Sequence, residues 1–147
     1  MINLISGDMF MLPFDILINP VNCVGVMGSG LALEFKRRYP QMFSAYKYEC
    51  LMGKLKPGKL YIWETPQCRI INLPTKNHWR DPSTYTYIKD GLKALREYLM
   101  RQGYVTVAIP ALGCGLGGLE WPKVYDLIVL YLADISAKIS VFGPRVK

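Results

Sequence analysis

The stretch Val-Asn-Cys-Val-Gly-Val-Met-Gly-Ser-Gly-Leu at residues 21–31 is the starting point for interpreting this chain. The apolar residues 16–18 before it predict a buried strand, and residues 32–39 after it predict a helix. A strand therefore leads into a glycine-rich loop that opens a helix. The glycines let the backbone approach a ligand closely, and the helix start supplies unpaired N–H groups and the positive end of a dipole. This arrangement favours phosphate binding.

A second stretch of the same kind, Leu-Gly-Cys-Gly-Leu-Gly-Gly-Leu, occupies residues 112–119. It follows an apolar strand at residues 105–109 and again precedes a predicted helix. Neither loop is a known nucleotide fingerprint, and either one alone is equally well a tight connection. Two such loops at equivalent places in one small domain favour anion binding, because together they can hold a diphosphate from both sides.

The 147 residues predict a single domain, 1–147, and 51% of them are hydrophobic, enough for a real core. No apolar run approaches the roughly 20 residues of a membrane span, and the first residues do not resemble a signal peptide. Four cysteines without a Cys-x-x-Cys pair, together with a single histidine, argue against a structural zinc site. We expect a reduced, cytoplasmic chain without a membrane segment.

The formal net charge of +7 points to an anionic partner, such as nucleic acid or a phosphate-bearing ligand. Ordinary solubility charge is the alternative. The positive residues are spread along the chain, with local groups at residues 36–38, at residues 54–59, and at Lys76 and Arg80.

Apolar runs and helical periodicity alternate along the chain, which predicts a three-layer α/β domain with a mainly parallel sheet. Strands are expected at residues 2–6, 15–22, 60–63, 69–73, 104–110 and 138–142, and helices at residues 32–39, 41–52, 85–102 and 121–133. Ligands in such sheets bind beyond the carboxyl ends of the strands. Asn22 ends the second strand and is placed for that role, although an Asx-turn that closes the loop is an equal alternative.

The polar segment at residues 74–82, Pro-Thr-Lys-Asn-His-Trp-Arg-Asp-Pro, interrupts this regular order. Taken alone, Lys76 is one of many solvated lysines, and His78 is a packed or capping residue. Trp79 either stacks on an unpaired base or packs into the core. Ser83 or Thr84 can cap the helix that follows.

Five motifs together resemble a macro domain over essentially the whole chain: Gly-Asp-Met-Phe at 7–10, Asn-Pro-Val-Asn at 19–22, the loop 25–30, Pro-Thr-Lys-Asn-His-Trp-Arg at 74–80, and residues 110–121. Within that family the chain is similar to the branch of DNA ADP-ribosyl glycohydrolase antitoxins, which is related to the terminal ADP-ribose protein glycohydrolases. The resemblance implies a three-layer α/β/α fold with a mixed, mainly parallel six-stranded sheet and an ADP-ribose cleft above it.

The resemblance also implies roles for individual residues. Asp8 would accept a hydrogen bond from the adenine amino group, the backbone of residues 27–30 would hold the distal ribose and one phosphate, and the backbone of residues 113–117 would hold the diphosphate. Lys76 would be catalytic. The full set of implied substrate-binding residues is Asp8, Met9, Asn22, Met27, Gly28, Ser29, Gly30, Leu31, Thr75, His78, Trp79, Gly113, Cys114, Gly115, Leu116 and Gly117.

Cleavage of an N-glycosidic bond builds positive charge at the anomeric carbon, which an amine can capture as a covalent adduct that water later resolves. The amine must be neutral, which desolvation or neighbouring cations favour. Related glycohydrolases carry an acidic residue where this sequence has Gly117. That difference leaves Lys76 with more of the catalytic work, or it favours a protein that binds without catalysis.

We therefore expect an enzyme that removes ADP-ribose from thymine in modified single-stranded DNA, with a DarT-type toxin as partner, and acting as a monomer. One alternative is hydrolysis of a free derivative such as ADP-ribose 1″-phosphate, and another is a non-catalytic ADP-ribose reader. The resemblance implies neither a cofactor nor a metal ion.

Overall fold

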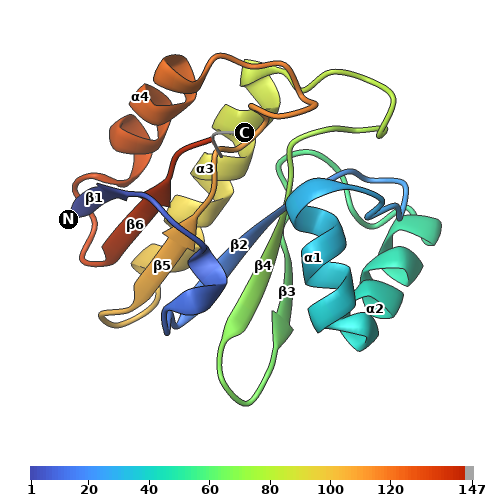
Figure 1. The fold of residues 1–147 in the computed structure, drawn as a ribbon, viewed down its shortest axis with the longest axis horizontal. Coiled ribbons are helices and arrows are strands. Elements are labelled where there is room, and N and C mark those ends of the chain that lie inside the picture. The colour runs from blue at the N-terminus through green and yellow to red at the C-terminus, as the bar shows by residue number, and fades with distance from the viewer. Residues whose placement is uncertain (145–147) are drawn as a thin grey trace.

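The structure is a computed structural model that describes residues 1–144. Its elements alternate as the sequence predicts (Figure 1): β1 (Ile2–Ile5), a 3₁₀ turn η1 (Met9–Met11), β2 (Ile16–Val21), α1 (Gly30–Arg38), α2 (Pro40–Leu51), β3 (Tyr61–Glu64), β4 (Arg69–Pro74), α3 (Tyr85–Met100), β5 (Thr106–Ile109), α4 (Trp121–Leu132) and β6 (Lys138–Phe142).

The strands form one six-stranded sheet in the order β1-β6-β5-β2-β4-β3. Only β3 runs antiparallel to its neighbour, β4, and the other pairs are parallel. The predicted mixed, mainly parallel sheet is confirmed. The order places the carboxyl ends of β2, β4 and β5 next to one another, although long stretches of chain separate these strands.

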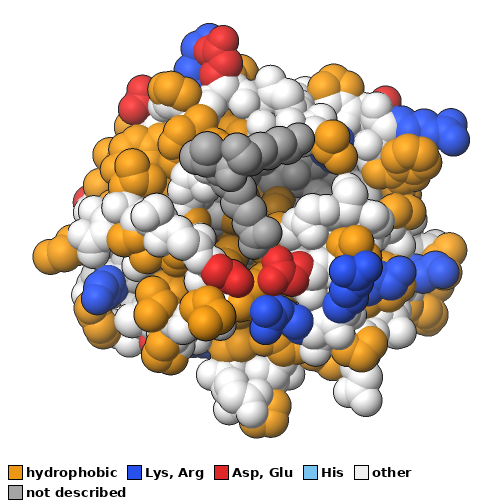
Figure 2. All heavy atoms as spheres, in the orientation of Figure 1, with side chains coloured by type: hydrophobic (Ala, Val, Ile, Leu, Met, Phe, Trp, Pro, Cys, Tyr) orange, Lys and Arg blue, Asp and Glu red, His pale blue; other side chains and the backbone are white. Residues whose placement is uncertain are grey.

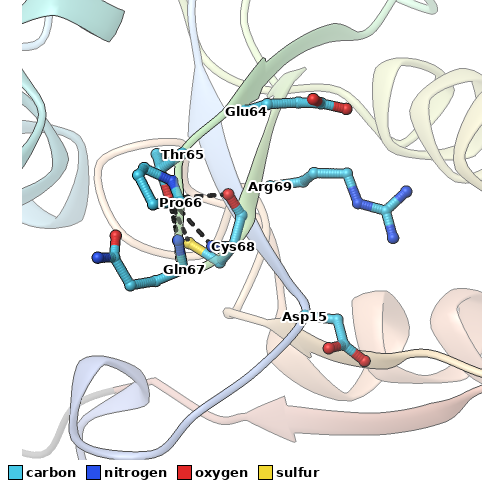
Figure 3. Close-up of a pocket in the computed structure, with 7 residues that line it drawn as sticks. All are labelled: Asp15, Glu64, Thr65, Pro66, Gln67, Cys68 and Arg69. Atoms are coloured by element: carbon cyan, nitrogen blue, oxygen red, sulfur yellow. Dashed lines mark hydrogen bonds between the residues drawn. The ribbon is translucent and has the colours of Figure 1, made fainter.

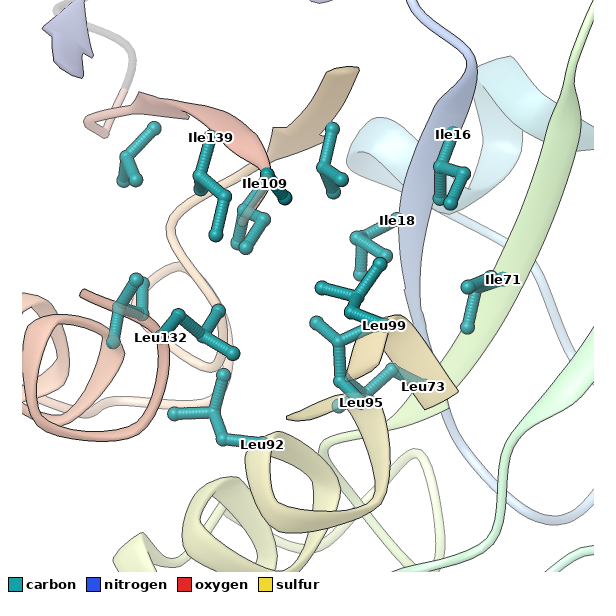
Figure 4. Close-up of a cluster of buried hydrophobic side chains, with 14 of the residues drawn as sticks. Ile16, Ile18, Ile71, Leu73, Leu92, Leu95, Leu99, Ile109, Leu132 and Ile139 are labelled. Carbon is teal, nitrogen blue, oxygen red and sulfur yellow. The ribbon is translucent and has the colours of Figure 1, made fainter. Parts of the chain in front are cut away.

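Helices cover both faces of the sheet, because side chains along each strand alternate between two apolar cores. Ile16 and Ile18 of β2 join the core beneath α3 and α4, together with Leu92, Leu95 and Leu99 at helical spacing (Figure 4). Leu17 and Val21 face the other way, into the core beneath α1 and α2. This gives the three-layer α/β/α architecture.

Most element bounds differ from the predicted ones by one or two residues. The first helix begins at Gly30, two residues earlier than predicted, because Ser29 has extended backbone and lies just before the helix. Thr84 caps α3 by accepting a hydrogen bond from the N–H of Tyr87, which confirms one of the two proposed capping residues. In residues 1–144, no helix is long and apolar enough to cross a membrane.

Candidate functional site

A cleft of about 880 Å³ lies at the carboxyl ends of the strands. This is the upper end of Figure 1, where the segments that follow β4 and β5 lie. The cleft contains most of the residues expected from the sequence: Met9, Asn22, Gly28, Ser29, Gly30, Leu31, Thr75, Lys76, Trp79, Gly113, Cys114, Gly115, Leu116 and Gly117. The two glycine loops thus line one cleft, as their equivalent positions predict.

The side chain of Asn22 forms hydrogen bonds to the backbone of the first glycine loop. Its side-chain oxygen accepts hydrogen bonds from the N–H groups of Val24 (3.1 Å) and Val26 (3.3 Å), and its amide nitrogen donates to the oxygen of Val26 (2.7 Å). The hydroxyl of the fully buried Tyr46 lies 2.8 Å from the same side-chain oxygen. The polar side-chain atoms of Asn22 are therefore engaged in closing the loop, which is the Asx-turn alternative.

The loops expose main-chain donors toward the cleft. Within residues 1–144, no acceptor takes the N–H groups of Gly28, Ser29 and Gly30, or those of the second loop at residues 115–117. Gly30 has φ +56°, a conformation that L side chains rarely adopt, and it begins α1. Free N–H groups at a helix start and in a second loop are the donors that an anionic ligand requires.

The second loop is closed by its own backbone. The oxygen of Gly113 accepts from the N–H of Leu119 at 2.9 Å, and the oxygen of Gly115 accepts from the N–H of Gly118 at 3.2 Å. A Cβ at Gly117 would lie 2.4 Å from both the Gly113 oxygen and the Ser83 hydroxyl oxygen. Position 117, where the resemblance implies an acidic residue, therefore has room for glycine only in this chain.

The segment at residues 75–84 connects the two loops. The N–H groups of Thr75 and Lys76 donate to the oxygen of Val21, at 2.9 and 3.4 Å, and the N–H of Cys23 donates to the oxygen of Asn77 at 3.0 Å. At its other end, the N–H of Ser83 donates to the oxygen of Gly117 at 3.1 Å. Lys76 is therefore carried by a segment fixed to both glycine loops.

Lys76 is half-buried in the cleft wall, and its ammonium group donates to the main-chain oxygen of Trp79 at 3.2 Å. Trp79 also lines the cleft and is 45% exposed, which rules out the core-packing alternative. The ring Nδ1 of His78 accepts from the N–H of Arg80 at 3.1 Å, so this nitrogen shapes the turn.

Three predicted site residues do not line the cleft. Asp8 uses one carboxylate oxygen to accept from the N–H of Phe10 at 2.9 Å, as the cap of η1, although Gly7 and Met9 beside it line the cleft. The side chain of Met27 is buried beneath the loop. His78 is not among the lining residues, and its ring lies 5.5 Å from that of Trp79. Their proposed ligand contacts stay predictions.

Sequence reasoning missed several residues at the site. Phe142, Gly143 and Pro144 line the cleft, and the rule that ligands bind beyond strand carboxyl ends would have found them, since they are the last residue of β6 and the two that follow it. Ser83 lines it as well, and its hydroxyl is buried without a hydrogen-bond partner among the described residues. No local signal marks Ser83, because its neighbours come from the distant loop at residues 113–117.

A second, smaller pocket of about 280 Å³ lies at the opposite ends of β2 and β4 (Figure 3). Two of its charged groups already bond to the protein: Asp15 accepts from the N–H of Thr106, and the guanidinium of Arg69 donates to Tyr98 and Gln102. Thr65 and Cys68 close the turn between β3 and β4. We assign this pocket no role.

Lysine and arginine side chains gather on the side of the molecule where α1 and α2 lie (Figure 2). The basic group at residues 36–38 occupies the last turn of α1, at the end away from the cleft. Lys36 lies over the ring of Phe43, and Arg38 lies over Phe10 and pairs with Glu34. Lys76 and Arg80 are the cations of the segment that closes the cleft.

The thiols of the two glycine loops are poor nucleophiles. Burial raises the pKa of Cys114 to about 11, and burial together with the nearby Cys50 raises that of Cys23 to about 12. In residues 1–144, no cluster of three His, Cys, Asp or Glu side chains could hold a metal ion. Lys76 is the nucleophile candidate that the cleft offers.

Comparison with known proteins gives consistent results. The family model of the macro domain matches residues 18–128. A protein of Mycobacterium tuberculosis named DNA ADP-ribosyl glycohydrolase is 45% identical over 91% of this chain and 40% of its own length. A Thermosipho africanus protein named DNA ADP-ribosyl transferase–DNA ADP-ribosyl glycohydrolase fusion protein is 33% identical over 99% of this chain and 42% of its own length. This chain thus spans about two fifths of these relatives.

The solved macrodomain of Mycobacterium tuberculosis DarG superposes with a TM-score of 0.93, at 42% identity and with 99% of each chain covered. The family model thus includes both loops and the segment between them, and the fold similarity extends over nearly the whole chain. The chain belongs to the macro domain family.

Proposed function

We propose that the cleft binds ADP-ribose. The free N–H groups of residues 28–30 and 115–117 are donors for the diphosphate, and the start of α1 adds a favourable dipole. The apolar walls beside Phe142 and Leu31 suit a base and the carbon faces of a ribose. The family and the structure of a Thermosipho africanus relative described as a complex with ADP-ribose support this ligand.

We further propose that the protein hydrolyses the N-glycosidic bond between ADP-ribose and a thymine base in single-stranded DNA. The neutral amine of Lys76 attacks the anomeric carbon, and the bond to the base breaks with its electron pair on the base, which takes the proton that the newly bonded nitrogen loses. A water then attacks the same carbon. The bond from this carbon to the lysine nitrogen breaks with its electron pair on the nitrogen, which takes the proton that the water loses, so that ADP-ribose is released and the amine is restored.

The observation that carries this proposal is the position of Lys76 on a segment bonded to both glycine loops. A ligand held by the two loops would be presented to this amine without rearrangement of the backbone, and such positioning lowers the barrier of a reaction. The names of the relatives at 41–45% identity support the same reaction. The name of the Thermosipho africanus fusion protein joins the two activities, which supports a cognate DNA ADP-ribosyl transferase as partner. We also propose that this partner is a DarT-type toxin and that the macro domain acts as a monomer.

The test uses three ligands: an oligonucleotide with one ADP-ribosylated thymine, ADP-ribose 1″-phosphate, and free ADP-ribose. We expect release of ADP-ribose from the oligonucleotide only, and a rise of about 2.7 kcal/mol in the free energy of unfolding at 100 times the dissociation constant of ADP-ribose. The oligonucleotide should bind with a stronger salt dependence than ADP-ribose.

Each other outcome selects an alternative. Turnover of ADP-ribose 1″-phosphate alone would identify a hydrolase of free derivatives, and binding without turnover would identify a reader. An unchanged melting temperature with millimolar ADP-ribose would refute the assignment of the cleft.

A further inference from the structure

An aromatic and cationic cluster stands at the rim of the cleft, at residues 78–80. The guanidinium of Arg80 lies 4.7 Å from the centre of the Trp79 ring, and the ring of His78 lies 5.5 Å from it at an interplanar angle of 31°. Arg80 and His78 thus both lie near the ring of Trp79, which is the one of the three that lines the cleft. The segment that carries them also carries Lys76.

Packing does not account for this cluster. Trp79 belongs to neither apolar core and keeps 45% of its surface exposed, although it is among the largest apolar side chains. Arg80 is exposed, and none of the ion pairs among the described residues includes it. An exposed indole beside an unpaired guanidinium, on the wall of a ligand cleft, is a surface that can accept a flat, electron-rich partner next to a negative charge.

We propose that Trp79 and Arg80 form a subsite for the nucleobase adjacent to the modified base in a single DNA strand. This proposal rests on the proposed function and specifies which part of the substrate the rim recognises. The base stacks against the exposed part of the indole and the guanidinium, and the phosphate between the two nucleotides meets the positive charge of Arg80. A duplex cannot use this subsite, because its bases are stacked on one another.

The subsite also lies in direct contact with the catalytic residue. The ammonium of Lys76 donates to the main-chain oxygen of Trp79 at 3.2 Å, so a base held on Trp79 fixes the carbonyl group that positions the lysine. The basic residues 36–38 cannot provide the subsite, because they lie at the far end of α1 and contact aromatic rings and Glu34 there.

The test compares kcat/KM of the whole protein for ADP-ribosylated thymidine and for a single-stranded oligonucleotide that carries the same modification. Trp79→Ala should lower the value for the oligonucleotide about tenfold or more, the loss that follows removal of one stacked aromatic side chain. The value for the nucleoside, which has no neighbouring base, should fall less than the value for the oligonucleotide, so the ratio of the oligonucleotide value to the nucleoside value should fall several-fold. Trp79→Phe should retain most activity on the oligonucleotide.

Tyr104→Ala is the matched control, because Tyr104 is a 70% exposed aromatic residue at the amino end of β5, remote from the cleft. Its kinetics should equal those of the wild type. If Trp79→Ala lowers kcat/KM by the same factor for the nucleoside and the oligonucleotide, the base subsite is overturned. It is also overturned if kcat/KM is unchanged for both substrates. A similar loss on an ADP-ribosylated peptide would also overturn it, in favour of a protein substrate.

Binding of an unmodified single-stranded oligonucleotide tests the subsite apart from the reaction. If the wild type does not hydrolyse the modified strand, the proposed function fails. The subsite then stands if Trp79→Ala binds the unmodified strand at least about fivefold more weakly than Tyr104→Ala, and it falls if the two variants bind equally.

Discussion

The hydroxyl of Tyr46 lies 2.8 Å from both the main-chain oxygen and the side-chain oxygen of Asn22. Tyr46 comes from α2, which contributes no residue to the lining of the cleft, and Asn22 follows the last residue of β2. A buried helix residue thus holds the start of the first glycine loop in place. We therefore expect binding by the backbone of that loop to depend on this remote contact.

Tyr46→Phe tests this dependence. The variant keeps the ring in the core but removes the donor to Asn22, so the free energy of unfolding should fall by about 1 kcal/mol and ADP-ribose should bind several-fold more weakly. Denaturant unfolding and calorimetry measure the two effects. Tyr48→Phe, at a 57% exposed position of the same helix, is the control and should change neither the free energy of unfolding nor the affinity for ADP-ribose. Wild-type affinity in Tyr46→Phe would show that the loop is held without the hydroxyl.

Gly115→Val tests the second loop as an anion site. A Cβ at Gly115 would meet no other atom within 4 Å, so the melting temperature should stay within a degree or two while binding of ADP-ribose is lost, because the side chain fills the space of the ligand. Gly103→Val is the control, since Gly103 also has open space but follows α3 away from the cleft. Retained binding in Gly115→Val would mean that the loop is only a connection. Gly30 is less suitable for this test, because its φ of +56° would strain any valine there.

Gly117→Ala should instead damage the fold of the loop. Its Cβ would collide with the Gly113 oxygen and the Ser83 hydroxyl, and we expect the free energy of unfolding to fall by about 1–3 kcal/mol together with weaker binding. Gly117→Asp should lose as much stability and gain no activity. A stable and more active Gly117→Asp would show that the loop rearranges to accept the acidic residue of the relatives.

Lys76→Ala should keep the affinity for ADP-ribose within a few-fold, because the backbone of the loops provides the binding. Hydrolysis of modified DNA should fall at least about 10²-fold, as is usual when a catalytic group is removed. Lys76→Arg should lose hydrolysis of modified DNA to a similar extent, since a guanidinium stays protonated and cannot act as a nucleophile. Single-turnover rates measure both effects, and normal activity of Lys76→Arg would show that a positive charge alone is sufficient.

The raised pKa values of Cys23 and Cys114 predict that these thiols stay protonated at pH 8. Iodoacetamide should therefore modify them slowly in the native protein and readily in urea, and Cys114→Ala should keep its activity. Mass spectrometry locates the label. Because the folded thiols hold their protons above the ordinary pKa of 9.0, the free energy of unfolding should fall as the pH rises above about 9. Fast labelling of Cys114 in the native protein would contradict the raised pKa of this thiol.

Local patterns in the sequence determined the fold. Apolar alternation gave the strands, helical spacing such as that of Leu92, Leu95 and Leu99 gave α3, and glycine-rich turns between strand and helix marked both loops. These signals act between residues a few positions apart, so they can be recognised without knowing the rest of the structure. The catalytic assignment of Lys76 and the role of Asp8 came from resemblance, and both stay predictions.

The tertiary structure alone decided how the loops are held. The strand order places the ends of β2, β4 and β5 together, so that the segment after β4 bonds to both glycine loops. The Tyr46–Asn22 contact spans 24 positions, and Ser83 reaches the second loop from before α3. Such contacts depend on which strands are neighbours, and no periodicity or turn preference of a single segment encodes that arrangement. For this reason the sequence predicted most of the loop residues that line the cleft, whereas only the folded chain showed which of them keep unbonded N–H groups and which hold the loops in place.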